Sequence, residues 1–118
     1  MKYMLLIYEN EQALDDEIRD HCYDESLQLV DRLQSKGQFL ATAPLQPTAA
    51  ATSVRVRDDK PLVTDGPFAE TREQLGGYVL IDVNDLDEAI DIAGRIPGAR
   101  RGVVEIRPVV ELSGLRGR

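Results

Sequence analysis

The 118-residue sequence predicts one α+β domain whose elements follow the order strand, helix, strand, hairpin, strand, helix, strand. Continuous apolar runs of strand length alternate with longer stretches whose apolar residues recur every three or four positions, as on one helix face. Between the helical stretches, two short alternating segments flank a polar turn, which is typical of a hairpin. Two right-handed strand–helix–strand crossovers around an antiparallel segment give a ferredoxin-like split sandwich with an extra β-hairpin.

Six segments have the length and composition of β-strands. Residues 2–8 (KYMLLIY) and 77–83 (GYVLIDV) are strongly apolar, which is typical of central strands covered on both faces. Shorter or alternating runs predict the other strands at 38–45, 53–57, 61–64 and 103–110. A polar turn at 58–60 joins the two middle segments into the hairpin.

The first helix follows an acidic segment and ends at Lys36-Gly37, a cation and then a glycine. Carboxylates in its first turn suit the positive end of the helix dipole. Its apolar stripe consists of Ile18, Cys22, Leu29 and Leu33. Ser26 interrupts this stripe, so its hydroxyl either bonds back to the carbonyl of Cys22 or faces a cavity.

The second helix starts at Asn84 or Asp85, because Asp85 and Glu88 have the spacing of a capping box. Pro97-Gly98 ends it. Its buried face consists of Leu86, Ala89, Ile90 and Ala93.

Composition and charge disfavour several classes of function. Charged residues make up 30% and apolar residues 42%, as in a globular domain, which we place at 1–112 with a flexible tail at 113–118. The net charge of −7 disfavours nucleic acid and anionic membranes as partners. The apolar start is too short to span a membrane, and the single cysteine suits the cytoplasm. One histidine and one cysteine are too few ligands for a usual zinc site within a single chain, and we expect no metal and no cofactor.

The strand at 77–83 is apolar on both sides, with Val79 and Ile81 on one face and Tyr78 and Leu80 on the other. Both predicted helices lie on one face of the sheet, so the other face has no helix to cover it. A second copy of the chain is the simplest cover, and we therefore expect a twofold homodimer.

The segment 64–77 (TDGPFAETREQLGG) is the main candidate for a site. Asp65 follows a strand, so it is either a general base or ligand anchor, or a turn residue that binds nearby backbone N–H groups. Gly66 and Pro67 are expected to shape the turn. Phe68 either floors a ligand pocket or fills the core.

The remaining candidates surround this segment. Thr71 and Gln74 predict a short capped helix, and Gly76-Gly77 allows close approach to a neighbouring chain segment. Beside Ser26, the candidate phenol donors for a ligand are Tyr8, Tyr23 and Tyr78. Cys22 is expected to be a small core residue, because no cationic partner is fixed beside it in the sequence.

The run TDGPFAETREQLGGY followed by LIDVNDLDEAI resembles the YCII-related domain, in the branch named for its Asp-Gly-Pro-Phe signature. The resemblance extends from KYMLLIYE to EIRPVVE and so covers nearly the whole chain. It implies a dimeric α+β barrel of ferredoxin-like subunits in a bacterial, cytoplasmic protein. Relatives sometimes lie beside, or are fused to, extracytoplasmic-function sigma factors.

One departure from the family concerns the first helix. Some members of the wider YCII group carry a histidine there, proposed to work with an aspartate, at a position that falls near Ser26. His21 lies five residues earlier, about 140° round the helix. The histidine–aspartate pair is therefore not carried over to this chain.

Three hypotheses remain open from the sequence. The first is a small-molecule binding protein or cofactor-free enzyme, with a pocket between the sheet and the DGPF loop and with Asp65 as base or anchor. The second is a non-catalytic regulatory protein associated with sigma factors. The third is a dimeric scaffold without a ligand.

Overall fold

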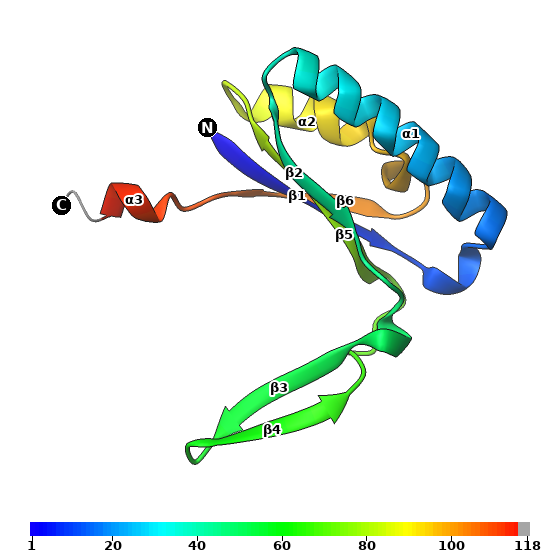
Figure 1. The fold of residues 1–118 in the computed structure, drawn as a ribbon, viewed down its shortest axis with the longest axis vertical. Coiled ribbons are helices and arrows are strands. Elements are labelled where there is room, and N and C mark those ends of the chain that lie inside the picture. The colour runs from blue at the N-terminus through cyan, green and yellow to red at the C-terminus, as the bar shows by residue number, and fades with distance from the viewer. Residues whose placement is uncertain (116–118) are drawn as a thin grey trace.

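The computed structural model describes residues 1–115 and confirms the ferredoxin-like α+β fold. Its four-stranded sheet has the order β2-β5-β1-β6, and every neighbouring pair is antiparallel. The helices α1 and α2 lie on one side of this sheet (Figure 1). The strands are β1 (Lys2–Glu9), β2 (Phe39–Pro44), β3 (Thr52–Arg57), β4 (Lys60–Asp65), β5 (Gln74–Asp82) and β6 (Val103–Pro108).

The helices lie where the sequence predicts them, but the predicted buried face of the second helix is wrong in part, since Leu86 and Ile90 are about half exposed and Ile92 is buried instead. The helices are α1 (Asp16–Ser35), α2 (Leu86–Arg95) and a short α3 (Leu112–Leu115), with 3₁₀ turns η1 (Glu11–Ala13), η2 (Thr48–Ala50) and η3 (Pro97–Arg100). The first residues after 112 are therefore helical, and residues 116–118 of the predicted tail lie outside the described residues.

Side-chain and glycine caps fix the helix ends. Asp15 accepts a hydrogen bond from the Ile18 N–H at 2.8 Å, and Asp85 accepts one from the Glu88 N–H at 3.0 Å. The Glu88 carboxylate in turn accepts a hydrogen bond from the N–H of Asn84 at 2.8 Å. In a regular capping box its partner would be the N–H of the N-cap residue itself, Asp85, so the predicted arrangement forms with a partner one residue earlier. At the other end of α1, Gly37 has φ +70°, a conformation that favours glycine.

The core lies between the sheet and the two helices. Leu5 of β1 and Ile81 of β5 are fully buried, each with 0% exposure. The other buried apolar residues are Tyr3, Leu29, Leu33, Val79, Val83, Ala89, Ile92, Ala93 and Ile96. Only the C-terminal half of α1 contributes to this core, through Leu29 and Leu33. The predicted stripe is therefore not buried along its whole length, because the N-terminal half of α1 borders a cleft instead.

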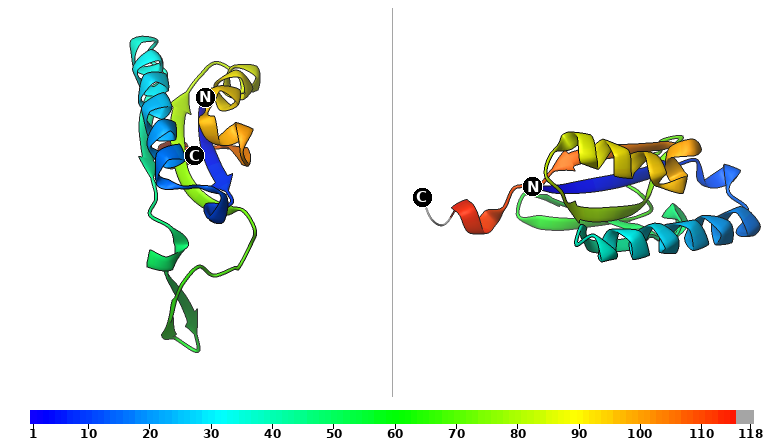
Figure 2. Two further views of the ribbon diagram at one scale, coloured as in Figure 1. Left: turned by 90° about the vertical axis from the view of Figure 1, so that its right-hand side faces the viewer. Right: turned by 90° about the horizontal axis from the view of Figure 1, so that it is seen from above.

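The hairpin β3–β4 stands apart from the four-stranded sheet, on the side away from α1 and α2 (Figures 1 and 2). Its turn is formed by Asp58 and Asp59, which both have positive φ, as a tight two-residue hairpin turn requires. The radius of gyration is 16.3 Å, against about 13.5 Å for a compact domain of this length. We call β3–β4 the arm and the rest of the fold the body.

The segment between the arm and β5 corrects two predictions. Thr71 and Gln74 do not form a short helix. Instead, the Thr71 hydroxyl donates to the Glu73 carbonyl at 2.7 Å, and the side-chain amide of Gln74 donates to the Thr71 carbonyl at 2.8 Å. Strand β5 begins at Gln74 because it continues to pair with the end of β1. Phe68 does not fill the core, since it is 83% exposed on the segment that leaves the arm.

Candidate functional site

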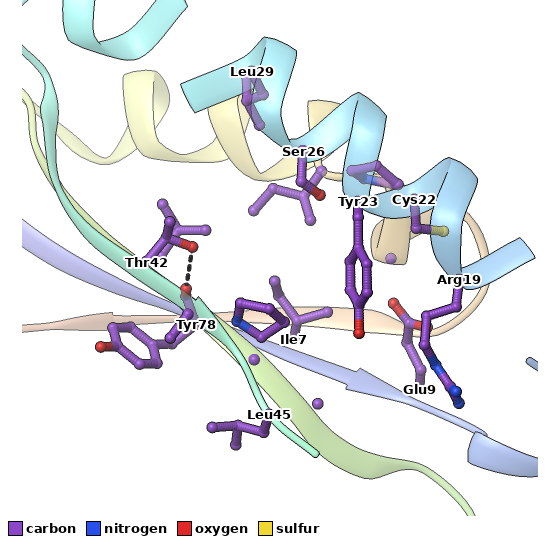
Figure 3. Close-up of a pocket in the computed structure, with 18 of the residues that line it drawn as sticks. Ile7, Glu9, Arg19, Cys22, Tyr23, Ser26, Leu29, Thr42, Leu45 and Tyr78 are labelled. Carbon is purple, nitrogen blue, oxygen red and sulfur yellow. Dashed lines mark hydrogen bonds between the residues drawn. The ribbon is translucent and has the colours of Figure 1, made fainter. Parts of the chain in front are cut away.

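A cleft of about 250 Å³ lies between the N-terminal half of α1 and the helix-facing side of the sheet (Figure 3). It exists because the buried contacts of α1 are confined to the helix's C-terminal half, so its first turns stand over β1, β2 and β5 without filling the space. Its walls are mainly apolar and include Ile7, Leu14, Leu29, Leu45, Val79 and Pro97. Such walls can hold an apolar molecule by removing its surface from water.

The polar groups gather near the start of α1. Tyr23 reaches from α1 into the cleft toward Ile7, and Arg19 and Glu9 lie beside each other farther along (Figure 3). Burial of its carboxyl raises the pKa of Glu9, although the charges of Arg101 and Arg19 act in the opposite direction. The cleft therefore offers a cation, a phenol and a carboxyl of raised pKa at one side of an apolar space.

Gly98 of η3 makes room for the Glu9 side chain. A Cβ atom at position 98 would overlap both the Glu9 carboxylate and the Ile7 side chain. Strand alternation explains how Glu9 reaches this place, since it follows Leu5 and Ile7 on the helix-facing side of β1. That alternation was the signal in the sequence that could have identified Glu9 as a site residue.

Cys22 has a cationic neighbour, contrary to the prediction from sequence. The Arg101 guanidinium donates a hydrogen bond to its sulfur, and the adjacent Arg100 pairs with Glu25 at 2.7 Å. Arg100 ends η3 and Arg101 follows it, and 79 positions separate Arg101 from Cys22, so no local pattern predicts the contact. Cys22 lines the cleft and is partly exposed.

Five of the predicted residues border the cleft. They are Tyr23, Ser26, Gly76, Gly77 and Tyr78. Ser26 makes no hydrogen bond to the Cys22 carbonyl within the described part of the chain, and it stands on the cleft wall (Figure 3). The Tyr78 ring points away from α1, so its carbonyl, which accepts from Thr42 at 2.8 Å, is the part nearer the cleft. Gly77 allows the predicted close approach, because a Cβ there would lie 3.1 Å from the Ala43 carbonyl oxygen.

The other predicted residues lie elsewhere in the single chain. Tyr8 follows Ile7 on β1 and therefore faces the opposite, open side of the sheet. Asp65 ends β4, is exposed, and makes no hydrogen bond through its carboxylate within residues 1–115. The cleft lies on the helix side of the sheet, and neither Asp65 nor Phe68 lines it, so the pocket expected beside the DGPF loop stays a prediction.

Gly66 and Pro67 have the structural place expected of them. Gly66 has φ +101°, and its N–H donates to the Ala51 carbonyl at 2.8 Å, while its own carbonyl accepts from the Ser53 hydroxyl at 2.7 Å. These bonds close the base of the arm, and Pro67 then leads the chain away from it.

Glu11 links the base of the arm to the cleft. Its two carboxylate oxygens accept hydrogen bonds from the N–H and the hydroxyl of Thr48, each at 2.8 Å. Glu11 and the neighbouring Pro47 both border the cleft. The segment before α1 is therefore attached to the segment that leads into β3.

His21 lies outside the cleft, as its helical position predicts. Its ring nitrogen is 3.0 Å from the Glu25 carboxylate, and its side chain is largely exposed. Among residues 1–115, no group of three or more histidine, cysteine or carboxylate side chains is placed to hold a metal. Within the same range, no helix is long and apolar enough to span a membrane.

The fold and the cleft together define a class of small ferredoxin-like domains with a cleft between the first helix and the sheet. The family model of the YCII-related domain matches residues 1–113, and the chain belongs to this family. Over 75 residues the chain is 45% identical to an uncharacterised protein of Rhizobium meliloti (strain 1021). This match covers 62% of the chain and 60% of that relative, so it spans less than two thirds of the relative's length.

The structure is also similar to that of the 5-chloro-2-hydroxyhydroquinone dehydrochlorinase of Burkholderia phenoliruptrix AC1100, solved in complex with 2,5-dihydroxybenzoquinone. The TM-score is 0.57, with 94% of this chain and 95% of that chain covered, at 11% sequence identity. At this identity the likeness confirms the fold, and the activity has to be argued from the cleft itself.

Proposed function

We propose that this chain binds a small, mainly apolar molecule carrying an anionic group in the cleft between α1 and the sheet. The observation that carries the proposal is the pairing of apolar walls with Arg19, Tyr23 and Glu9 at one side. An apolar cavity of about 150 Å³ already holds benzene, so a space of about 250 Å³ suits a single substituted ring.

Glu9 is the group best suited to proton transfer in this cleft. Burial raises the pKa of the Glu9 carboxyl, and a carboxyl whose pKa is perturbed inside a cleft is suited to exchange a proton with a bound molecule. Arg19 would hold the anionic group, and Tyr23 would donate a hydrogen bond. We propose on this basis a cofactor-free acid–base enzyme, with Glu9 rather than Asp65 as the catalytic residue.

The structurally similar dehydrochlorinase supports the size and kind of ligand. Its complex contains 2,5-dihydroxybenzoquinone, a single ring bearing acidic hydroxyl groups. A molecule of this class would place its ring between the apolar walls and its acidic oxygen beside Arg19.

We further propose a twofold homodimer in the bacterial cytoplasm. The single cysteine and the uncovered sheet face support this assignment. Asp65, Gly66, Pro67 and Phe68 carry the motif of the DGPF branch, in which we place the chain. Within one chain Asp65, Phe68 and Tyr8 lie outside the cleft, so any part they have in ligand binding requires the second copy.

The binding proposal is tested by titration calorimetry and thermal shift with 2,5-dihydroxybenzoquinone, benzoate and the neutral analogue benzamide. We expect saturable binding of the anions, and Arg19→Gln should weaken it at least tenfold. The matched control is Arg32→Gln, on the same helix but outside this cleft, which should change affinity less than twofold. Equal losses in both variants, or no binding of any ring acid at millimolar concentration, would contradict the proposal.

A further inference from the structure

Two consecutive arginines attach the turn after α2 to the N-terminal half of α1. Arg100, the last residue of η3, pairs with Glu25 at 2.7 Å, and the Arg101 guanidinium donates a hydrogen bond to the sulfur of Cys22. The buried residues of α1 all lie in its C-terminal half. The two arginines therefore hold the part of the helix that stands over the cleft and is not secured by the core.

The same turn supports Glu9 from the other side. Gly98 of η3 leaves the room that the Glu9 side chain occupies, because a Cβ atom there would overlap the carboxylate. The Gly98 carbonyl accepts hydrogen bonds from the N–H of Arg101 at 3.2 Å and from the N–H of Gly102 at 2.8 Å. One short piece of backbone thus begins against the Glu9 carboxyl and ends at Arg101, and it fixes how the two side chains are placed.

Arg101 influences Glu9 without forming a salt bridge with it. Burial raises the pKa of the Glu9 carboxyl, and the positive charges of Arg101 and, to a smaller extent, Arg19 oppose this rise. Within residues 1–115, however, the side-chain hydrogen bond of Arg101 goes to Cys22, and no salt bridge joins Arg101 to Glu9. The guanidinium is therefore close enough to act on the carboxyl through its charge, but it does not occupy the carboxylate oxygens.

The other titratable groups around Glu9 come from α1 and from the segments that flank β1 and β5. They are Glu11, Arg19, Cys22, Tyr23 and Glu73. Arg19 and Tyr23 reach from α1 into the cleft and would meet a ligand there (Figure 3). Arg101 is not one of the residues that line the cleft. Any effect of Arg101 on a ligand therefore passes through Glu9 or Cys22.

The distance between a guanidinium and a carboxylate decides what the carboxylate can do. In a direct ion pair the carboxylate is kept ionised and its oxygens are occupied by N–H donors. Such a group is poorly suited to take up a proton or to bond to another molecule. A guanidinium held farther away still acts through its charge, and it leaves the oxygens available.

We propose that Arg101 is a positioning residue of the cleft, and that the Cys22 sulfur holds its guanidinium away from a direct ion pair with Glu9. This rests on the acid–base role proposed for Glu9 and names the residues that keep its carboxyl available to a ligand. Loss of the sulfur releases Arg101 to pair with Glu9. Loss of Arg101 leaves Arg19 as the cation beside the carboxyl.

The first test follows the carboxyl carbon of Glu9 by NMR across pH in the full chain without ligand, with Glu9→Gln used to assign its signal. Arg101→Gln removes a positive charge and should move the titration midpoint of Glu9 to higher pH. Cys22→Ala should move it to lower pH, whereas Cys22→Ser keeps a hydrogen-bond acceptor and should stay nearer the wild type. Combining Cys22→Ala with Arg101→Gln should abolish the downward shift, because the released cation is then absent.

The matched control for this titration is Arg100→Gln, which removes the neighbouring arginine and its bond to Glu25. Its Glu9 midpoint should lie much closer to the wild type than that of Arg101→Gln. Shifts of the same sign in Cys22→Ala and Arg101→Gln would mean that the sulfur brings the guanidinium to Glu9, and they would overturn the proposal. A wild-type midpoint in Cys22→Ala would overturn it as well.

The second test measures the affinity for benzenesulfonate, a ring anion that stays ionised across the pH range, by titration calorimetry. Affinity should fall as Glu9 ionises, because like charges repel, and the pH of this fall should move in opposite directions in Arg101→Gln and Cys22→Ala. Binding whose pH profile ignores both variants contradicts the role of Arg101 and leaves the binding proposal intact. Opposite shifts in the NMR titration without binding of any ring acid support the role of Arg101 and contradict the binding proposal.

Discussion

The body and the arm are built from the same kinds of residue, yet only the body buries them. Leu5 and Ile81 of the body are fully enclosed, whereas Val54 and Val63 of the arm are more than half exposed. The body is held by packing, while the arm is held by its tight turn and by the hydrogen bonds at Gly66. An alternation of apolar and polar residues therefore predicts a strand, but it does not predict whether the chain itself covers the apolar side of that strand.

The sharpest contrast should come from truncating one residue in each region. Leu5→Ala should lower the free energy of unfolding by about 2–5 kcal/mol, because it opens a cavity in a fully packed core. Val54→Ala should change it by less than ~0.5 kcal/mol in dilute protein, because the Val54 side chain is already 62% exposed. Urea unfolding followed by circular dichroism measures both. A large loss for Val54→Ala under those conditions would mean that the arm already belongs to the core.

A smaller effect is expected at the start of α2. Asp85→Ala removes the bond to the Glu88 N–H and should cost ~1 kcal/mol of unfolding free energy. Asp87→Ala, in the same turn, should lose only the weaker interaction with the helix dipole, a few tenths of a kcal/mol. If the two variants are equally destabilised in thermal unfolding, the cap is not what secures this end of the helix.

The pH dependence of stability should distinguish Glu9 from a carboxylate outside the body. Because burial raises its pKa, the native state holds the Glu9 proton more tightly than the unfolded state does. This contribution to stability is complete below the ordinary pKa of glutamate and is lost as pH rises through the raised value. As pH rises from the ordinary pKa of glutamate through the raised pKa of Glu9, the free energy of unfolding should therefore fall less in Glu9→Gln than in wild type.

Melting temperatures from pH 4 to 8 measure this difference. Glu70→Gln, on the exposed segment after the arm, is the control and should follow the wild-type curve. A Glu9→Gln curve parallel to wild type throughout would show that the carboxyl titrates normally, and it would remove the basis for Glu9 as an acid–base group.

The smallest effect should be confined to the arm. Asp59 has φ +61°, which glycine adopts without the strain that a Cβ brings. Asp59→Gly should slow amide hydrogen exchange within β3–β4 and change global unfolding by less than ~0.5 kcal/mol. Slower exchange in β1 or β5 as well would indicate that the arm and the body unfold as one unit.

Much of the fold was predictable because its signals are local. The apolar runs, the Asp85 and Glu88 spacing and the Lys36-Gly37 end each depend on residues within one or two helical turns. The ferredoxin-like order followed from these elements together with the handedness of crossovers. The extension of β5 to Gln74 was missed because it depends on pairing with the end of β1, far away in sequence.

The site was less predictable than the fold, because residues that are far apart in the sequence form it. The sequence drew attention to Asp65 and Phe68 because their motif is unusual, but Asp65 ends the arm, Phe68 lies on the segment after it, and neither borders the cleft. Glu9 and Arg101 come from the ends of different strands and turns, and only the folded chain brings them to α1. Ser26 was found because it interrupts the apolar stripe of the first helix, whereas Tyr23 was named only as a candidate phenol donor; both line the cleft.

The Glu11 side chain, whose carboxylate accepts two hydrogen bonds from Thr48, belongs to two parts of the molecule. Glu11 borders the cleft and also holds the segment that leads into β3. A change at Glu11 should therefore disturb the border of the cleft and the attachment of the arm together, because a single carboxylate serves both.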